Sequence, residues 1–118
     1  MDSILTSIKN LLGIEEDQTN FDIAIMIHIN NVFMALNQLG VGPANGFMIG
    51  DKSKEWEDYS DSINIRSAAT TYVYIKVKLV FDPPATGPLT DALERQGKEA
   101  EFRLQTEGER SETNGTTV

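Results

Sequence analysis

Apolar residues recur along this chain with the spacing of amphipathic helices, and polar or glycine-rich segments separate them. Residues 3–12 predict a short helix with one apolar face, formed by Ile4, Leu5, Ile8, Leu11 and Leu12. Asp2 or Ser3 can cap its start, and Gly13 can end it in a left-handed conformation. A helix this short is marginal alone, so it must pack on other elements.

The segment from about 20 to 39 is compatible with two structures. Its first part alternates as a half-buried strand would, through Phe21, Ile23, Ile25, Ile27 and Ile29. The longer window repeats at steps of 4, 3, 4 and 3 through Ile25, Ile29, Val32, Leu36 and Leu39. Thr19 with Asp22 resembles a capping box, and Gly40 is a natural stop. We therefore favour a helix.

Residues 63–82 pose the same choice. Their second half alternates as a strand, through Val73, Ile75, Val77, Leu79 and Phe81. A helical stripe also runs through Ile65, Ala68, Ala69, Tyr72, Ile75 and Leu79. A segment that is apolar on most sides is a central helix or a central strand. It ends at Asp82-Pro83-Pro84, because proline lacks an amide hydrogen and disfavours helix geometry in the preceding residue.

The middle of the chain predicts loop structure, and the end predicts a helix followed by a tail. Five glycines or prolines between Gly40 and Gly50 predict a loop-rich middle over 40–62. Residues 88–106 predict a helix with acid-to-base pairs four residues apart, and Gly97 weakens it by about 1 kcal/mol. The polar residues 107–118 predict a flexible acidic tail that is disordered or ordered by a partner. The expected organisation is one helical domain over 1–106 and this tail.

Composition narrows the possible functions. Ten Lys and Arg against 18 Asp and Glu give a formal net charge of −8, which argues against a protein that grips nucleic acid or an anionic membrane. The absence of cysteine excludes disulfides and thiolate sites. No apolar run is long enough for a membrane span, and the first ten residues lack the basic region of a signal peptide. We expect a small acidic intracellular protein without membrane contact.

Signals of chemistry are weak. The only histidine, His28, lies between two isoleucines and is best explained as a packed core residue. No nucleophile, phosphate-binding or zinc motif is present, and the acidic stretch over 51–61 lacks the spacing of a calcium loop. We therefore predict that the protein is not an enzyme and uses no cofactor and no metal.

Aromatic side chains are better candidates for partner binding. Trp56 and Tyr59 lie three residues apart in a charged stretch, so one helical turn would direct both rings the same way. They either anchor a partner or close one end of the core. Phe102 lies nearly opposite Leu93 on its helix, off the core stripe, which favours an intersubunit contact. Leu104, in the same closing segment, completes the predicted partner-binding set.

Several stretches, in order, resemble the head–tail connector proteins of long-tailed bacteriophages, also called adaptors or head-completion proteins. They are IKNLLGI, FDIAIMIHINNVFMALNQLGVGP, GFMI, TYVYIKVKLVFDPP and LTDALERQGKEAEFRL. The resemblance covers about residues 3–106, and INNVFMALNQLGVGP and YIKVKLVFDPP are its most specific parts. It implies a small all-α bundle of four to five helices, so both ambiguous segments become helices.

The resemblance also implies a function. Such proteins form a homo-oligomeric ring, usually a dodecamer, between the portal and the next connector or tail-completion protein. DNA passes through the lumen without specific binding. The expected place is the head–tail junction of the virion, after assembly in the bacterial cytoplasm. By this comparison residues 88–118 are the portal-docking arm, and 40–62 contact a neighbour or the tail. The alternative function is a small acidic interaction module, such as an inhibitor that mimics DNA.

Overall fold

All named secondary-structure elements in the described part of the chain are helices, which confirms the all-α prediction. The computed structural model describes residues 3–116, with side chains described over 3–108. The elements are α1 (Ile4–Leu11), α2 (Asp22–Gln38), α3 (Trp56–Tyr59), α4 (Ile63–Phe81) and α5 (Gly87–Thr116). The remaining chain between α2 and α3 is loop, as predicted for residues 40–62.

Helical periodicity prevails in both ambiguous segments. In α2 the buried residues are Ile25, Ile29, Phe33 and Leu36, which follow the helical spacing. The strand pattern would place Ile23 and Ile27 on the same face as Ile25, whereas their side chains are 73% and 55% exposed. The helical pattern prevails because it extends over the whole segment, while the alternation covers only its first half.

The ends of the helices follow local sequence signals, with one exception. Ser3 caps α1 by accepting a hydrogen bond from the Thr6 amide, and α4 ends at Phe81 just before Asp82-Pro83. The predicted capping box of Thr19 and Asp22 is wrong. Residue 21 occupies the N-cap of α2 and no side chain caps it. Asp22 is instead drawn to the ammonium group of Lys9, so its carboxylate does not turn back onto the helix.

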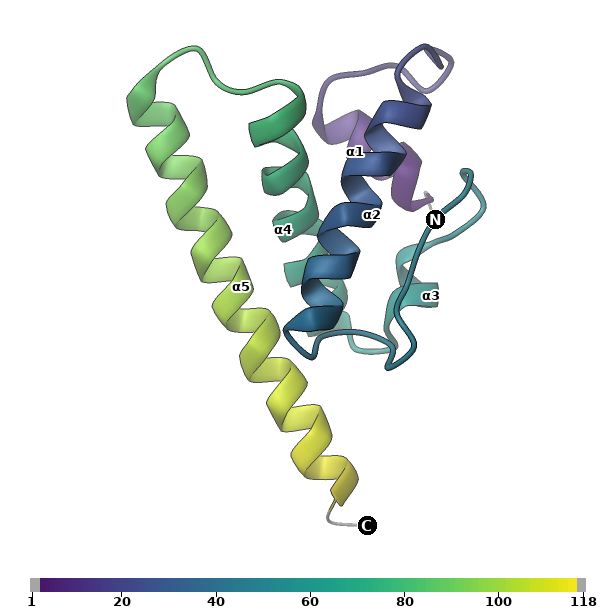
Figure 1. Cartoon of the computed structure of the whole chain (residues 1–118), viewed down its shortest axis with the longest axis vertical. Helices are drawn as coiled ribbons and strands as arrows, with labels where there is room; N and C mark the ends of the chain where they lie inside the picture. The colour runs from purple at the N-terminus through teal and green to yellow at the C-terminus, as the bar shows by residue number, and fades with distance from the viewer. Residues whose placement is uncertain (1–2, 117–118) are drawn as a thin grey trace.

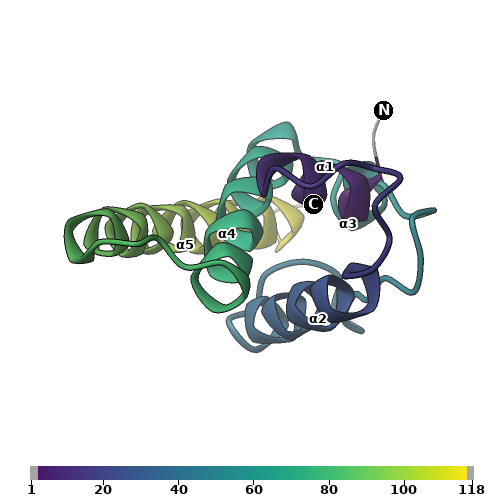
Figure 2. The same cartoon turned by 90° about the horizontal axis from the view of Figure 1, so that it is seen from above.

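Helix α4 is the centre of the bundle. Helices α1, α2, α3 and α5 all pack against it, and α2 and α5 lie along different sides of it (Figures 1 and 2). Its buried residues point in several directions, which explains why its sequence is apolar on most sides. The buried side chains of all five helices and of the middle loop join into one core.

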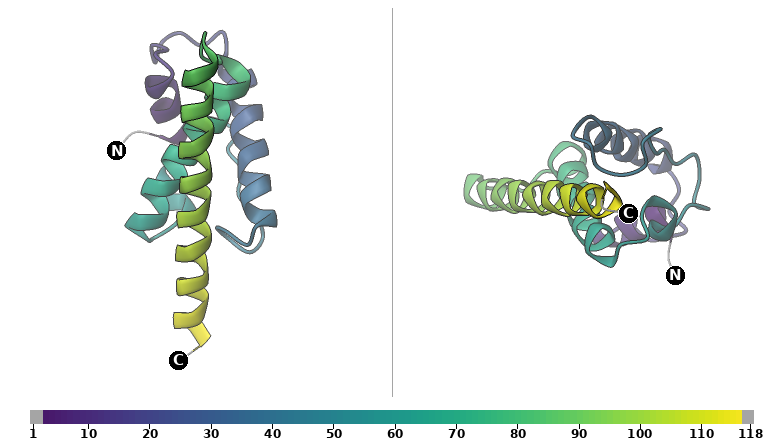
Figure 3. Two further views of the ribbon diagram at one scale, coloured as in Figure 1. Left: turned by 90° about the vertical axis from the view of Figure 1, so that its left-hand side faces the viewer. Right: turned by 90° about the horizontal axis from the view of Figure 1, so that it is seen from below.

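Helix α5 is longer than the sequence predicted. It was expected to end at residue 106 and continues through Thr116, as a straight arm that projects beyond the bundle (Figure 3). No proline interrupts residues 107–116, and three glutamates and one arginine favour helix there, against two glycines and four Ser, Thr or Asn residues that lower its helix propensity. The division into a domain over 1–106 and a tail stays a prediction, and residues 117–118 lie outside the described part.

At Gly97, α5 packs closely against α4. A β-carbon at this position would lie 3.3 Å from Cγ2 of Ile75. The glycine that lowers helix propensity therefore lets the two backbones pack closely, and Ala100 and Leu104 continue the same contact side.

Candidate functional site

The two aromatic residues of α3 lie inside the core. Trp56 and Tyr59 are 7% and 4% exposed, and both rings pack against Phe33 of α2, with ring centroids 6.1 and 4.9 Å away. The indole Nε1 of Trp56 also donates a hydrogen bond to Ser7 Oγ at 2.9 Å. The single turn directs both rings the same way, as predicted. In the single chain they close one end of the core, and partner binding by them stays a prediction.

The other two predicted partner-binding residues have different environments. Phe102 is 69% exposed on the outer side of α5, off the core stripe as its position on the helix indicated. Leu104 is fully buried against the bundle. Among these four residues, only Phe102 is available to a partner without a rearrangement. Contact with a partner stays a prediction for all four.

Asparagine side chains fasten the middle loop to α2. Asn30 makes two hydrogen bonds to the backbone of Ile49, donating to its carbonyl at 2.9 Å and accepting from its amide at 2.8 Å. Asn37 donates to the carbonyl of Pro43 at 3.1 Å. These bonds satisfy loop backbone groups that water would otherwise solvate. The apolar periodicity of the sequence did not indicate this role, although an asparagine within an apolar helix is a signal for it.

Lys9 is a second structural residue that the sequence analysis missed. It is one of the most buried side chains of the protein, and its Nζ donates hydrogen bonds to the carbonyls of Glu16 and Gln18 at 2.9 and 2.8 Å. It also lies 2.8 Å from Asp22 Oδ1, as an ion pair. One ammonium group thus ties α1, the following loop and the start of α2 together.

His28 is half-buried rather than fully packed in the core. Its ring lies against Phe81, with centroids 6.4 Å apart, and Phe81 in turn contacts Phe21 at 5.6 Å. These rings cover the end of the bundle where α4 stops. His28 also lines an open hollow together with Val32, Tyr72 and Lys76. Its contact with Phe81 is a packing contact, although the predicted position in the core is only partly correct.

The Tyr59 hydroxyl is buried without a hydrogen-bond partner. Burial raises the pKa of Tyr59 to about 12. The pKa of Tyr72 is also raised to about 12, by burial first and then by the nearby Glu101 carboxylate, to which its hydroxyl donates a hydrogen bond at 3.2 Å. Neutral phenols are therefore part of the folded state.

We expect Tyr59→Phe to leave the free energy of unfolding unchanged or to raise it slightly, because it removes a buried hydroxyl that has no partner.

Both tyrosines have raised pKa values in the fold, so their contribution to stability is fully present below pH 10 and falls as the pH rises towards 12. Denaturant unfolding at neutral and alkaline pH measures both effects. The variant should show a smaller alkaline loss. A clear loss of stability at neutral pH would contradict this account.

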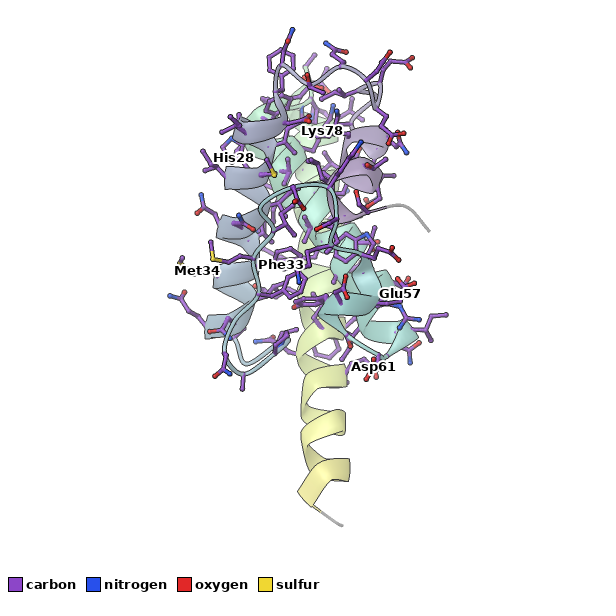
Figure 4. All side chains as sticks on the ribbon, turned by 90° about the vertical axis from the view of Figure 1, so that its right-hand side faces the viewer. His28, Phe33, Met34, Glu57, Asp61 and Lys78 are labelled. Atoms are coloured by element: carbon purple, nitrogen blue, oxygen red, sulfur yellow. The ribbon has the colours of Figure 1, made fainter. Side chains whose placement is uncertain are left out.

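The outer side of α2 carries a patch of exposed apolar residues. Ile23, Ile27 and Met34 of α2, with Met48 of the middle loop, form what we call the α2 face, and these four side chains are between 55% and 73% exposed. Met34 points away from the bundle while its neighbour Phe33 points into it (Figure 4). Ile27, Met34 and Met48 line an open depression of about 600 Å³, whose lining has no charged residue. From Ile23 to Gln38, α2 contains no acidic residue, lysine or arginine.

Two kinds of site are not found in the described residues. Over residues 3–116, no group of three or more potential ligands among His, Cys, Asp and Glu is placed to hold a metal ion. Within the same range, no helix has both the length and the apolar character that crossing a bilayer requires.

Comparison with known proteins identifies the family. Neither the curated proteins nor the solved structures contain a match to this chain. The sequence profile described as phage connector protein matches residues 4–111. Members of this family are structural virion components that associate with other head and tail proteins. Because the match covers nearly the whole chain, this protein belongs to the phage connector family and is a phage head–tail connector.

Proposed function

We propose that copies of this chain form a ring between the portal and the tail, where they extend the DNA channel and join head to tail. The observation that carries the proposal is the α2 face. The bundle already has a closed core, yet four large apolar side chains stay in water on one side. Scattered apolar residues are ordinary on a surface, whereas a contiguous apolar patch marks a contact with another protein.

The arm formed by residues 88–118 is proposed to dock on the portal. Ala100 and Leu104 hold the first part of α5 on the bundle, and beyond Gly108 the helix projects past it (Figure 3). A projecting helix has few tertiary contacts to stabilise it, and docking on a partner would supply them. Phe102 lies exposed on the outer side of this arm. The middle loop, 40–62, is proposed to contact a neighbouring subunit or the tail.

Charge agrees with a channel that DNA crosses without binding. Each copy has a net charge of −8, so a ring would concentrate negative charge around its axis. A negative wall repels the DNA backbone and lets the duplex slide. The same charge is compatible with a DNA-mimicking inhibitor. The two functions differ in assembly, because the inhibitor would act as a monomer and compete with DNA for a protein.

Electron microscopy of the full chain mixed with the portal of its own phage tests the proposal. We expect an added ring of density on the portal. A chain that ends at Gly108 should keep the helices of the bundle and lose only the helical signal of residues 109–116. Its loss of stability should be below about 1 kcal/mol, because the core residues of α5 precede the cut. The shortened chain should not bind the portal.

Two outcomes would count against the proposal. If the shortened chain binds the portal as well as the full chain, the part of the arm beyond Gly108 has no docking role. If the full chain stays a monomer beside the portal and displaces DNA from a DNA-binding protein, the inhibitor function is correct.

A further inference from the structure

We infer that the α2 face of one subunit packs into a groove between α4 and α5 of the next subunit. The inference rests on the proposed function, since it names the two surfaces through which the ring would be built. A head-to-tail ring needs two different surfaces on each subunit, placed so that successive copies turn about an axis.

The α4/α5 groove is the second surface. It is an open hollow of about 340 Å³, lined by Asn64, Ser67, Ala68 and Thr71 of α4 and by Ala100, Arg103 and Glu107 of α5. Most of these side chains are short. The α2 face differs from the groove in the size of its side chains, because isoleucine and methionine side chains project from it. Large projecting residues and a hollow of short ones are sterically complementary.

The two surfaces lie on different flanks of the subunit. A separate hollow between α2 and α4 is lined by Tyr72, Lys76 and Val80, which identifies the side of α4 next to α2. At 3.6 residues per turn, the groove residues Ser67 and Thr71 are roughly 150° away around α4. In the left view of Figure 3, α2 lies on one side of α5 and the first half of α4 on the other.

The distribution of charge points to a second copy of this chain as the occupant. Two subunits of charge −8 repel each other wherever carboxylates meet. Helix α4 contains no Asp or Glu, and α2 contains none after Asp22, although the chain has 18 acidic residues. The α5 side of the groove contributes one carboxylate, Glu107, and one guanidinium, Arg103. The α2 face has no carboxylate to oppose Glu107, so two acidic copies can meet at these surfaces without paired carboxylates.

The absence of cysteine from the sequence allows a direct test. A full-length variant with Met34→Cys and Ser67→Cys carries one thiol on each surface, and it is oxidised after mixing with the portal. We expect a ladder of disulfide-linked dimers, trimers and larger species that includes most of the bound protein. A matched pair, Met34→Cys with Leu11→Cys, places the second thiol on an exposed residue of α1, outside both surfaces and outside the proposed arm, and should give only background linkage.

A second variant tests the α2 face without a crosslink. Ile27→Glu adds one carboxylate to the uncharged surface and should raise the concentration needed for ring assembly by about thirtyfold or more. Leu11→Glu is its control, because Leu11 is similarly exposed but lies outside both surfaces and outside the proposed arm, and it should have little effect. Circular dichroism of the free proteins verifies that both variants fold.

The outcomes separate this inference from the proposed function. If a ring forms on the portal but the Met34 and Ser67 thiols do not link, the inference is wrong and the proposed function stands. If Met34→Cys alone yields dimers, two α2 faces meet each other and the inference is also wrong. If no ring forms on the portal, the proposed function fails and the inference fails with it.

Discussion

Replacing Lys9 with methionine is expected to lower the free energy of unfolding by about 3 kcal/mol, near the lower end of the cost of breaking a buried ion pair. The substitution keeps the length and the apolar stem of the side chain but removes its charge. It leaves the carbonyls of Glu16 and Gln18 without their donor and Asp22 without its counter-ion. Asp22 keeps some contact with water, which limits the loss. Chemical denaturation measures the difference directly.

Lys78→Met is the matched control for Lys9. Lys78 pairs with Asp82 at the same Nζ–Oδ distance of 2.8 Å, but this pair is on the surface, and Asp82 is largely exposed. Surface pairs contribute less than about 1 kcal/mol, so the control should change stability little. Equal losses from the two variants would show that burial of Lys9 has no special effect, and the proposed tie between α1 and α2 would be wrong.

Gly42→Ala is expected to cost about 3 kcal/mol, for two separate reasons. Gly42 has a φ of +90°, a conformation that residues with a β-carbon rarely adopt. In addition, a β-carbon there would lie 2.7 Å from the hydroxyl and 2.8 Å from Cε1 of Tyr59. The Tyr59 ring is packed against Phe33 and Phe47 and has little room to move. Thermal or denaturant unfolding measures the loss.

Gly46→Ala separates the two reasons. Gly46 has almost the same φ, +89°, but a β-carbon there would meet no atom within 4 Å. Its replacement should cost only the backbone strain, about 1 kcal/mol. The excess loss at Gly42 then measures the collision with Tyr59, and it should shrink when Tyr59 is also replaced by alanine. Losses of equal size at the two glycines would contradict the collision.

The interaction surfaces were only partly predictable from the sequence. The position of Phe102 on its helix indicated that it would be exposed, and it is. The sequence left two roles open for Trp56 and Tyr59, anchoring a partner or closing one end of the core. The structure places both rings in the core of the single chain. The α2 face was not identified, because α2 is apolar around most of its surface. A surplus of apolar residues can be counted in a sequence. Which side of the helix stays exposed to water depends on the elements that pack against that helix.

Local features of this protein follow from the sequence alone. Three helix ends and one helix cap depend only on backbone geometry and on residues within one or two turns. They are the ends at Gly13, Gly40 and Asp82-Pro83 and the cap at Ser3. The two ambiguous segments could also be assigned as helices, because a period sustained over the whole segment outweighs a short alternation.

Only the tertiary structure determined the burial of Lys9, the fastening of the middle loop by Asn30 and the contact of Gly42 with Tyr59. Asn30 and Ile49 are 19 positions apart in the chain, and Gly42 and Tyr59 belong to different elements. Hydrophobic burial has no direction and depends on area alone, so a sequence pattern shows which residues can be buried but not which partners they meet. Those partners are decided when the helices pack around α4.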